Sequence, residues 1–210
     1  MKKCRLENYC RRPNPLTTNT LAYLLSINIF LAILLYLVLN LLYSSLLKHI
    51  VIVDVLVIST GYLLRIAVGG LAVEAQLSSW IVLCTLFISL FLGFGKRRSE
   101  LITFRGSPTY RAVLQQYSVS LLDYIIVITA TLTIVTYSLY TIDARSGKAL
   151  GATGLIYTLP FVIYGIFKYL YQLFKNRQGC DPADILLQDK TILIDIVLWI
   201  VTVVLILCFQ

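Results

Sequence analysis

An apolar run at residues 80–94 carries no charge, and the motif Gly-Lys-Arg-Arg-Ser-Glu follows it directly at residues 95–100. A run that stops at three cations and a carboxylate is typical of a membrane helix that reaches an aqueous surface. The same cations could bind phosphate if they faced the interior of a helix bundle. The motif therefore predicts a membrane helix and leaves open a phosphate site at its end.

Similar apolar runs recur along the whole chain. Of the 210 residues, 59% are hydrophobic, which excludes an ordinary soluble domain. We predict an all-α fold, a polytopic membrane bundle of about six transmembrane helices, at roughly residues 21–46, 51–73, 79–95, 118–140, 152–174 and 190–209. Residues 1–20 form a basic N-terminal tail, and residues 21–210 form one transmembrane domain.

The charge pattern predicts the orientation of the bundle. The formal net charge of +8 is concentrated between the apolar runs, and no soluble basic domain remains to bind nucleic acid. One side of a six-helix bundle receives nine cations, namely Lys48, Lys96, Arg97, Arg98, Arg105, Arg111, Lys175, Arg177 and Lys190. The opposite loops carry Arg145 and Lys148, so we expect the first side to be cytosolic. The basic tail falls on the other side, which suggests that something upstream is missing or rearranged.

Two ionisable residues lie inside the second predicted helix. Asp54 and Arg65 are eleven residues apart, close to three helical turns, so they share a face about 16 Å apart along the axis. Tyr62 lies on the same side, one turn from Arg65. Ionisable groups at this depth are costly unless they face protein or water. We expect this stripe to line a polar cavity; the alternative is snorkelling toward the lipid headgroups.

The predicted loops at residues 96–117 and 175–190 carry further candidate site residues. Lys96 or Arg97 would share a helical face with Glu100, which could orient a phosphate-binding arginine or hold a metal ion. The alternative for this loop is a basic segment that only sets topology. In the second loop, Asp181 or Asp184 could cap the following helix, and the carboxylates of Asp181, Asp184 and Asp189 could also bind Mg²⁺, with Asp184 and Asp189 as the candidate ligands. We interpret Asp123 and Asp195 as helix-end residues at the membrane interface.

Several segments together resemble the UbiA prenyltransferase superfamily, and more closely its decaprenyl-phosphate phosphoribosyltransferase branch. They are DVLVISTGYLLRIAVGG at residues 54–70, LFISLFLGFGKRRSEL at residues 86–101, and DPADILLQDK at residues 181–190. Tyr43 followed by Lys48 also resembles an element of this family. The resemblance implies a bundle of usually nine membrane helices around a cavity that opens to the cytosol and the lipid. It also implies transfer of 5-phosphoribosyl from phosphoribosyl diphosphate to a polyprenyl phosphate, with release of diphosphate.

The resemblance also implies roles for individual residues. Asp54 and Glu100 are the candidate catalytic residues. Candidate substrate or phosphate ligands are Lys48, Tyr62, Arg65, Lys96, Arg97, Arg111 and Tyr117. The implied partners are a polyprenyl phosphate lipid, phosphoribosyl diphosphate and membrane lipids, with a homo-oligomer or a missing N-terminal half as a further partner. The implied location is the cell membrane.

The family normally binds Mg²⁺ through an NDxxDxxxD motif, and this motif does not occur in the sequence. The first apolar segment matches the fourth helix of the family, so we expect an N-terminally truncated form. It could be a truncated gene product, half of a split enzyme or a degenerate paralogue. The alternatives to an enzyme are a non-catalytic subunit that binds an intact homologue and a small transporter that uses Asp54 and Arg65.

Overall fold

The computed structural model describes residues 31, 34–45, 47–72, 77–103, 116–142, 154–175 and 189–208. These residues contain helices and no strand, which confirms the predicted all-α class. The elements are a helix at Leu34–Ser45, the 3₁₀ helix η2 (Leu47–His49), α2 (Val53–Ala72), α3 (Ser79–Thr103), α4 (Val119–Ile142), the 3₁₀ helix η4 (Leu155–Thr158), α6 (Leu159–Lys175) and α8 (Lys190–Cys208).

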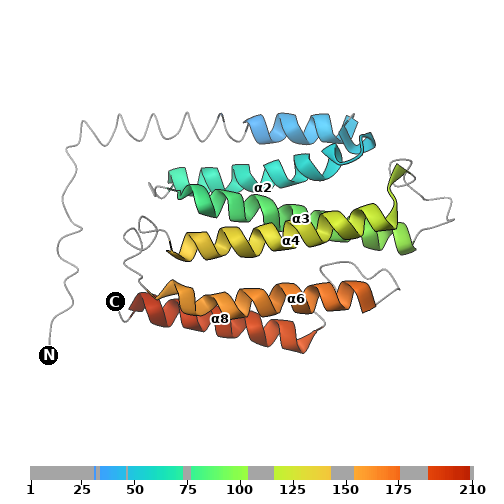
Figure 1. The fold of residues 1–210 in the computed structure, drawn as a ribbon. Helices are drawn as coiled ribbons and strands as arrows, with labels where there is room; N and C mark the ends of the chain where they lie inside the picture. The colour runs from blue at the N-terminus through green and yellow to red at the C-terminus, as the bar shows by residue number, and fades with distance from the viewer. Residues whose placement is uncertain are drawn as a thin grey trace, which may run out of the picture.

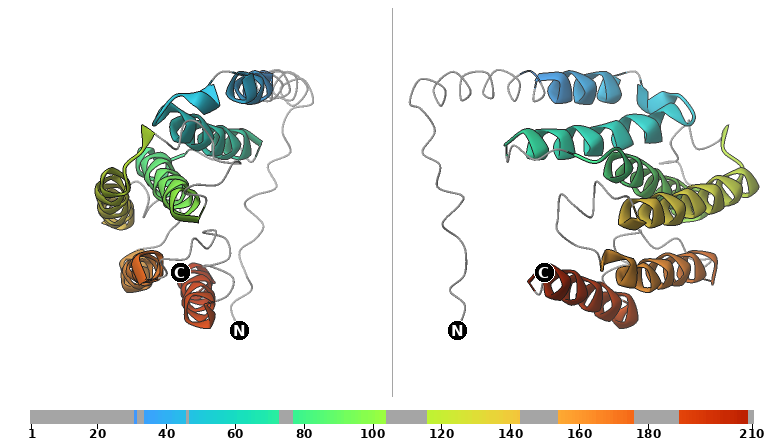
Figure 2. Two further views of the ribbon diagram at one scale, coloured as in Figure 1. Left: turned by 90° about the vertical axis from the view of Figure 1, so that its right-hand side faces the viewer. Right: turned by 60° about the vertical axis from the view of Figure 1, so that its left-hand side comes forward.

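The helices lie side by side and alternate in direction (Figure 1). Within the described residues, α2, α3 and α4 are long and apolar enough to cross a membrane. Figure 2 shows the Leu34–Ser45 helix and α2 on one side of the bundle, α6 and α8 on the other, and α3 and α4 between them. The protein is therefore a helical membrane bundle, as the apolar runs predict.

Side chains just before three of the helices cap their N-termini. The hydroxyl of Ser78 accepts a hydrogen bond from the amide of Trp80, and that of Ser118 accepts one from the amide of Leu121. Asp189 does the same for α8 through the amide of Thr191. Each cap satisfies an amide that the helix itself leaves unpaired. The caps explain why α3, α4 and α8 begin close to their predicted starts.

The structure corrects the predicted end of the third membrane segment. We expected the helix to end at residue 95 and residues 96–117 to form a loop, but α3 continues to Thr103. The residues that follow Gly95 are mostly good helix formers, and their charged side chains find partners inside the bundle. The cationic motif is therefore helical, and Arg97, Arg98 and Ser99 are buried.

The core lies where the second half of α3 packs between α2, α4 and α6. Phe91 and Phe94 of α3 are buried there, and Phe91 meets Tyr169 of α6 edge to face, with ring centroids 5.0 Å apart. Leu122 and Ile126 of α4 are fully buried beside them. This packing fixes the basic end of α3 against three neighbouring helices.

Gly93 provides the close approach between α2 and α3, and replacing it should weaken the bundle. A Cβ at this position would lie 2.6 Å from Cγ1 of Val55, which is fully buried. We expect Gly93→Ala to destabilise the protein by about 1–3 kcal/mol through overpacking. Thermal unfolding in detergent would measure the loss. Adding Val55→Ala should recover part of it, and a double variant no better than Gly93→Ala would contradict this explanation.

Candidate functional site

The side chain of Arg97 lies at the centre of a buried polar cluster near the end of α3. Its Nε donates to Oδ2 of Asp54 at 2.6 Å, and its Nη1 donates to Oε2 of Glu100 at 2.6 Å. Its Nη2 donates to the hydroxyl of Tyr43 at 3.3 Å. Arg97 is 4% exposed and Asp54 is fully buried. The cluster therefore joins α2, α3 and the Leu34–Ser45 helix through one oriented guanidinium.

Tyr117 completes the cluster from the segment that precedes α4. Its hydroxyl donates to Oδ1 of Asp54 at 3.0 Å and accepts the amide of Ile52 at 2.5 Å. Burial raises the pKa of Tyr117 to about 12, so it remains a neutral donor at working pH. Ile52 has a φ of 69°, a left-handed conformation that a β-branched residue rarely adopts. The bond from Tyr117 helps to hold this strained turn, which sets where Asp54 enters α2.

Arg98, the next residue of α3, has a different set of partners. Its Nε donates to Oδ1 of Asp123 in α4 at 2.5 Å, and its Nη1 donates to the backbone oxygen of Leu173 in α6 at 2.8 Å. Its guanidinium also lies 4.8 Å from the ring centroid of Phe174. Leu173 is among the last residues of α6, whose carbonyl groups have no partner within the helix. Arg98 therefore connects α3 to α4 and caps α6 with a positive charge.

The structure brings several predicted site residues to one end of the bundle. Lys48 lies in η2 and Lys96 in α3, both with exposed side chains, at the same end as Arg97 and Glu100. The cations Lys48, Lys96, Arg97 and Arg98 and the carboxylates Asp54, Glu100 and Asp123 are among the described charged residues at this end. The candidates Arg111 and Asp184 lie outside the described residues.

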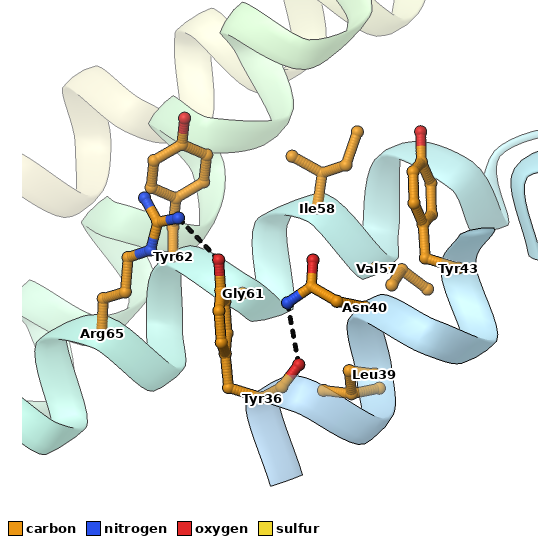
Figure 3. A pocket seen from close by; sticks show the side chains of 9 residues that line it. All are labelled: Tyr36, Leu39, Asn40, Tyr43, Val57, Ile58, Gly61, Tyr62 and Arg65. Atoms are coloured by element: carbon orange, nitrogen blue, oxygen red, sulfur yellow. Dashed lines mark hydrogen bonds between the residues drawn. The ribbon is translucent and has the colours of Figure 1, made fainter. Parts of the chain in front are cut away.

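Arg65 and Tyr62 lie apart from this cluster, in a pocket of about 160 Å³ between the Leu34–Ser45 helix and α2 (Figure 3). We expected Asp54 and Arg65 to line a common cavity, but among the described residues Asp54 is not part of the lining of this pocket. Asp54 contacts Arg97 of α3, whereas Arg65 contacts Tyr36 of the Leu34–Ser45 helix. Eleven residues of α2 do separate Asp54 and Arg65 by about three turns, as predicted. Different helices, however, pack against α2 at the positions of these two residues. Tyr43 belongs to both places, because it lines the pocket and contacts Arg97.

Asp189 is engaged as the cap of α8. Its carboxylate accepts hydrogen bonds from the backbone amide and the hydroxyl of Thr191. It also accepts one from the side-chain amide of Gln172 at 2.5 Å, and it lies 3.4 Å from Nζ of Lys168. Asp195, which we interpreted as a helix-end residue, lies six residues further along, nearly two turns, and is buried against Gly165. Asp123 does lie near the start of α4, paired with Arg98.

Replacing Asp189 should give a loss of stability that depends on pH. The bonds from Thr191 and Gln172 hold the pKa of Asp189 well below its usual range. The unfolded pKa is about 4, so the stabilisation is complete above that pH and disappears as pH falls through the lower folded pKa. We expect Asp189→Ala to melt below the unmodified protein at pH 7 and to approach it in strong acid. A melting difference that does not change with pH would contradict this account.

Mg²⁺ usually binds through one or two protein carboxylates together with substrate phosphates, so the arrangement of carboxylates is the feature to compare with it. No three His, Cys, Asp or Glu side chains in the part of the chain that the structure describes come together as metal ligands. Both oxygens of Asp54 are engaged, and the carboxylate of Glu100 is held by Arg97. Between these two carboxylates, the place a cation would take is filled by a guanidinium. Mg²⁺ therefore stays a prediction of the resemblance.

Comparison with known proteins points to one group of enzymes. No protein-family model matches the chain. A protein of Mycobacterium tuberculosis named decaprenyl-phosphate phosphoribosyltransferase is 33% identical over 183 residues, which cover 87% of this chain. Proteins of the same name from Mycolicibacterium smegmatis and Corynebacterium glutamicum are 30% and 29% identical over 195 and 159 residues. The three relatives share one name.

The chain spans 59% of the length of the two mycobacterial relatives and 47% of the corynebacterial one. These identities support the resemblance to UbiA-type prenyltransferases that the sequence segments carry.

Sequence reasoning missed several residues of these sites. Tyr36 and Asn40 were not singled out, and Tyr43 was named only with Lys48 as an element of the family. The three are polar positions three and four residues apart in an apolar helix, so helical spacing could have revealed their common face. Arg98 was not among the predicted site residues, although it has as many partners as Arg97. No local pattern distinguishes the two arginines, because, apart from Glu100, their hydrogen-bond partners lie 25 to 75 residues away.

Proposed function

We propose that this protein is a membrane transferase of the UbiA superfamily that moves 5-phosphoribosyl from phosphoribosyl diphosphate to a polyprenyl phosphate. The observation that carries this proposal is the oriented guanidinium of Arg97, held by Asp54 and Glu100 in a chain similar to enzymes of that name. Two carboxylates on one buried arginine fix its position without using all of its N–H groups. Such preorganised donors suit a phosphate group that gains charge during a reaction.

In this reaction the bond between the ribose carbon and the diphosphate oxygen breaks, and a phosphate oxygen of the lipid takes its place. Negative charge grows on the departing diphosphate, where the two remaining N–H groups of Arg97 can donate. Asp54, Glu100 and Tyr117 act as positioning residues, since their partners are Arg97 and one another. Lys48 and Lys96 supply the positive charge that attracts two anionic substrates.

We further propose that the end of the bundle with these cations faces the cytosol. The last turns of α3 and α6 and the start of α8 lie at this end (Figure 1), and with η2 these segments carry the described cations Lys48, Lys96, Arg97, Arg98, Lys175 and Lys190. An excess of lysine and arginine marks the cytosolic side of membrane proteins. Phosphoribosyl diphosphate, a strongly charged molecule, would then reach Arg97 from the water phase. The membrane in question would be the cell membrane.

A transfer assay with radiolabelled phosphoribosyl diphosphate tests the proposal. Membranes that contain the protein should transfer label to added polyprenyl phosphate, and Arg97→Gln should lower the rate by about 100-fold or more. Lys175→Gln, an exposed cation with the same change of charge, should not alter the rate. Circular dichroism of each purified variant would show that the helices remain.

Two results would overturn the enzyme proposal. One is an unmodified protein that neither transfers label nor binds phosphoribosyl diphosphate. The other is a folded Arg97→Gln variant with undiminished transfer. If the inactive protein copurifies with an intact homologue, the results would favour a non-catalytic subunit.

A further inference from the structure

The pocket between the Leu34–Ser45 helix and α2 contains a second guanidinium. Tyr36 and Asn40 line it from the first helix, and Gly61, Tyr62 and Arg65 line it from α2 (Figure 3). The two helices pack closely at Gly61, where a Cβ would make an ordinary van der Waals contact with the ring of Tyr36 at 3.5 Å. The volume of the pocket, about 160 Å³, is several times the roughly 30 Å³ that one water molecule occupies in the liquid. We call it the Arg65 pocket.

Among the described residues, the partners of Arg65 are neutral. Its Nη2 donates to the hydroxyl of Tyr36 at 2.7 Å, and its guanidinium carbon lies 5.4 Å from the ring centroids of both Tyr36 and Tyr62. Within the described residues, no carboxylate forms an ion pair with it. The aromatic rings attract the cation but do not neutralise it. Arg65 therefore differs from Arg97, which is held by two carboxylates.

The position of Arg65 in α2 makes this charge expensive. It lies twelve residues after Val53 and seven before Ala72. At 1.5 Å per residue, these separations are about 18 Å from the basic end and about 10 Å from the opposite end. An arginine inside a membrane span costs several kcal/mol unless it finds an anion, water or the headgroup region. The nearest anions are the lipid phosphates of the leaflet opposite to the basic end, toward which arginine side chains snorkel.

We propose that the Arg65 pocket binds the phosphate of an anionic membrane lipid from that leaflet. The guanidinium has five N–H donors, and the bond to Tyr36 uses one of them. Its planar fork matches two oxygens of one phosphate. The rings of Tyr36 and Tyr62 suit the interfacial depth at which a headgroup meets the acyl chains. The lipid would supply the negative charge that the described residues do not place beside Arg65, and this role is independent of transferase activity.

Native mass spectrometry of the detergent-purified protein tests this inference. Phosphatidylglycerol carries one unmasked phosphate charge, whereas the choline of phosphatidylcholine offsets that charge. We expect phosphatidylglycerol to remain bound and phosphatidylcholine to be lost. Arg65→Gln should weaken phosphatidylglycerol binding by about tenfold or more, the loss of one charge-assisted interaction. Tyr36→Phe, which keeps the ring and removes the hydroxyl, should weaken it less.

Matched controls distinguish this site from general attraction to a basic protein. Lys175→Gln makes the same change of charge outside the pocket and should bind phosphatidylglycerol as the unmodified protein does. Inorganic phosphate, added in place of lipid, should raise the melting temperature less than phosphatidylglycerol does. The inference is overturned if Arg65→Gln and Lys175→Gln bind phosphatidylglycerol equally, if phosphatidylcholine binds as tightly, or if inorganic phosphate stabilises the protein and phosphatidylglycerol does not.

Discussion

Asp54→Ala is expected to lower the free energy of unfolding by about 3–5 kcal/mol, because it removes one of the two carboxylates that hold a buried guanidinium. Arg97 is 4% exposed, so water cannot readily replace the lost partner. The hydroxyl of Tyr117 would lose its acceptor as well. Equilibrium unfolding in detergent micelles, followed by circular dichroism, would measure the change.

A second substitution tests whether the unpaired positive charge of Arg97 causes the loss of stability in Asp54→Ala. Arg97→Met added to Asp54→Ala leaves one carboxylate, on the less buried Glu100, and should recover much of the lost stability. Glu100→Gln alone should cost less than Asp54→Ala, since the side chain of Glu100 is 14% exposed and that of Asp54 is 1% exposed. A double variant as unstable as Asp54→Ala would show that the cavity, and not the unpaired charge, causes the loss.

Arg98→Ala should have the second largest effect and should act on a different part of the bundle. It removes hydrogen bonds to Asp123 of α4 and to the backbone of Leu173 in α6. Hydrogen bonds that involve a charged group contribute about 1.5–3 kcal/mol each, so we expect a loss of roughly 3 kcal/mol, reduced by the partial exposure of Asp123. Hydrogen exchange should show the amides of α6 and α8 losing protection before those of α2 and α3.

The conservative variant Arg98→Lys provides the control. It keeps the charge near Asp123 but cannot reach both partners with a rigid fork, so its stability should be intermediate. Phosphoribosyl diphosphate binding by the folded fraction should persist in Arg98→Ala, because we assign Arg98 to the packing of α3 against α4 and α6 and Arg97 to substrate binding. Equal loss of protection in all helices would contradict the assignment of Arg98 to the junction of α3, α4 and α6.

The sequence by itself determined the helical membrane bundle and the end at which its cations gather. Apolar runs of membrane length leave only helices as a way to satisfy the backbone, so this conclusion needs no tertiary contact. Spacing also placed Glu100 on one helical face with Lys96 or Arg97, and the structure selected Arg97 as its ion-pair partner.

The tertiary structure decided the separate roles of the two arginines in the cationic motif. Adjacent helical residues point about 100° apart, so Arg97 meets α2 and Arg98 meets α4 and α6. Their partners Asp54 and Asp123 are 43 and 25 residues away in sequence. The packing of the helices also placed Arg65 against two tyrosines and away from Asp54. Spacing along one helix gives the direction of a side chain, but the neighbouring helix at that level decides whether its charge is neutralised.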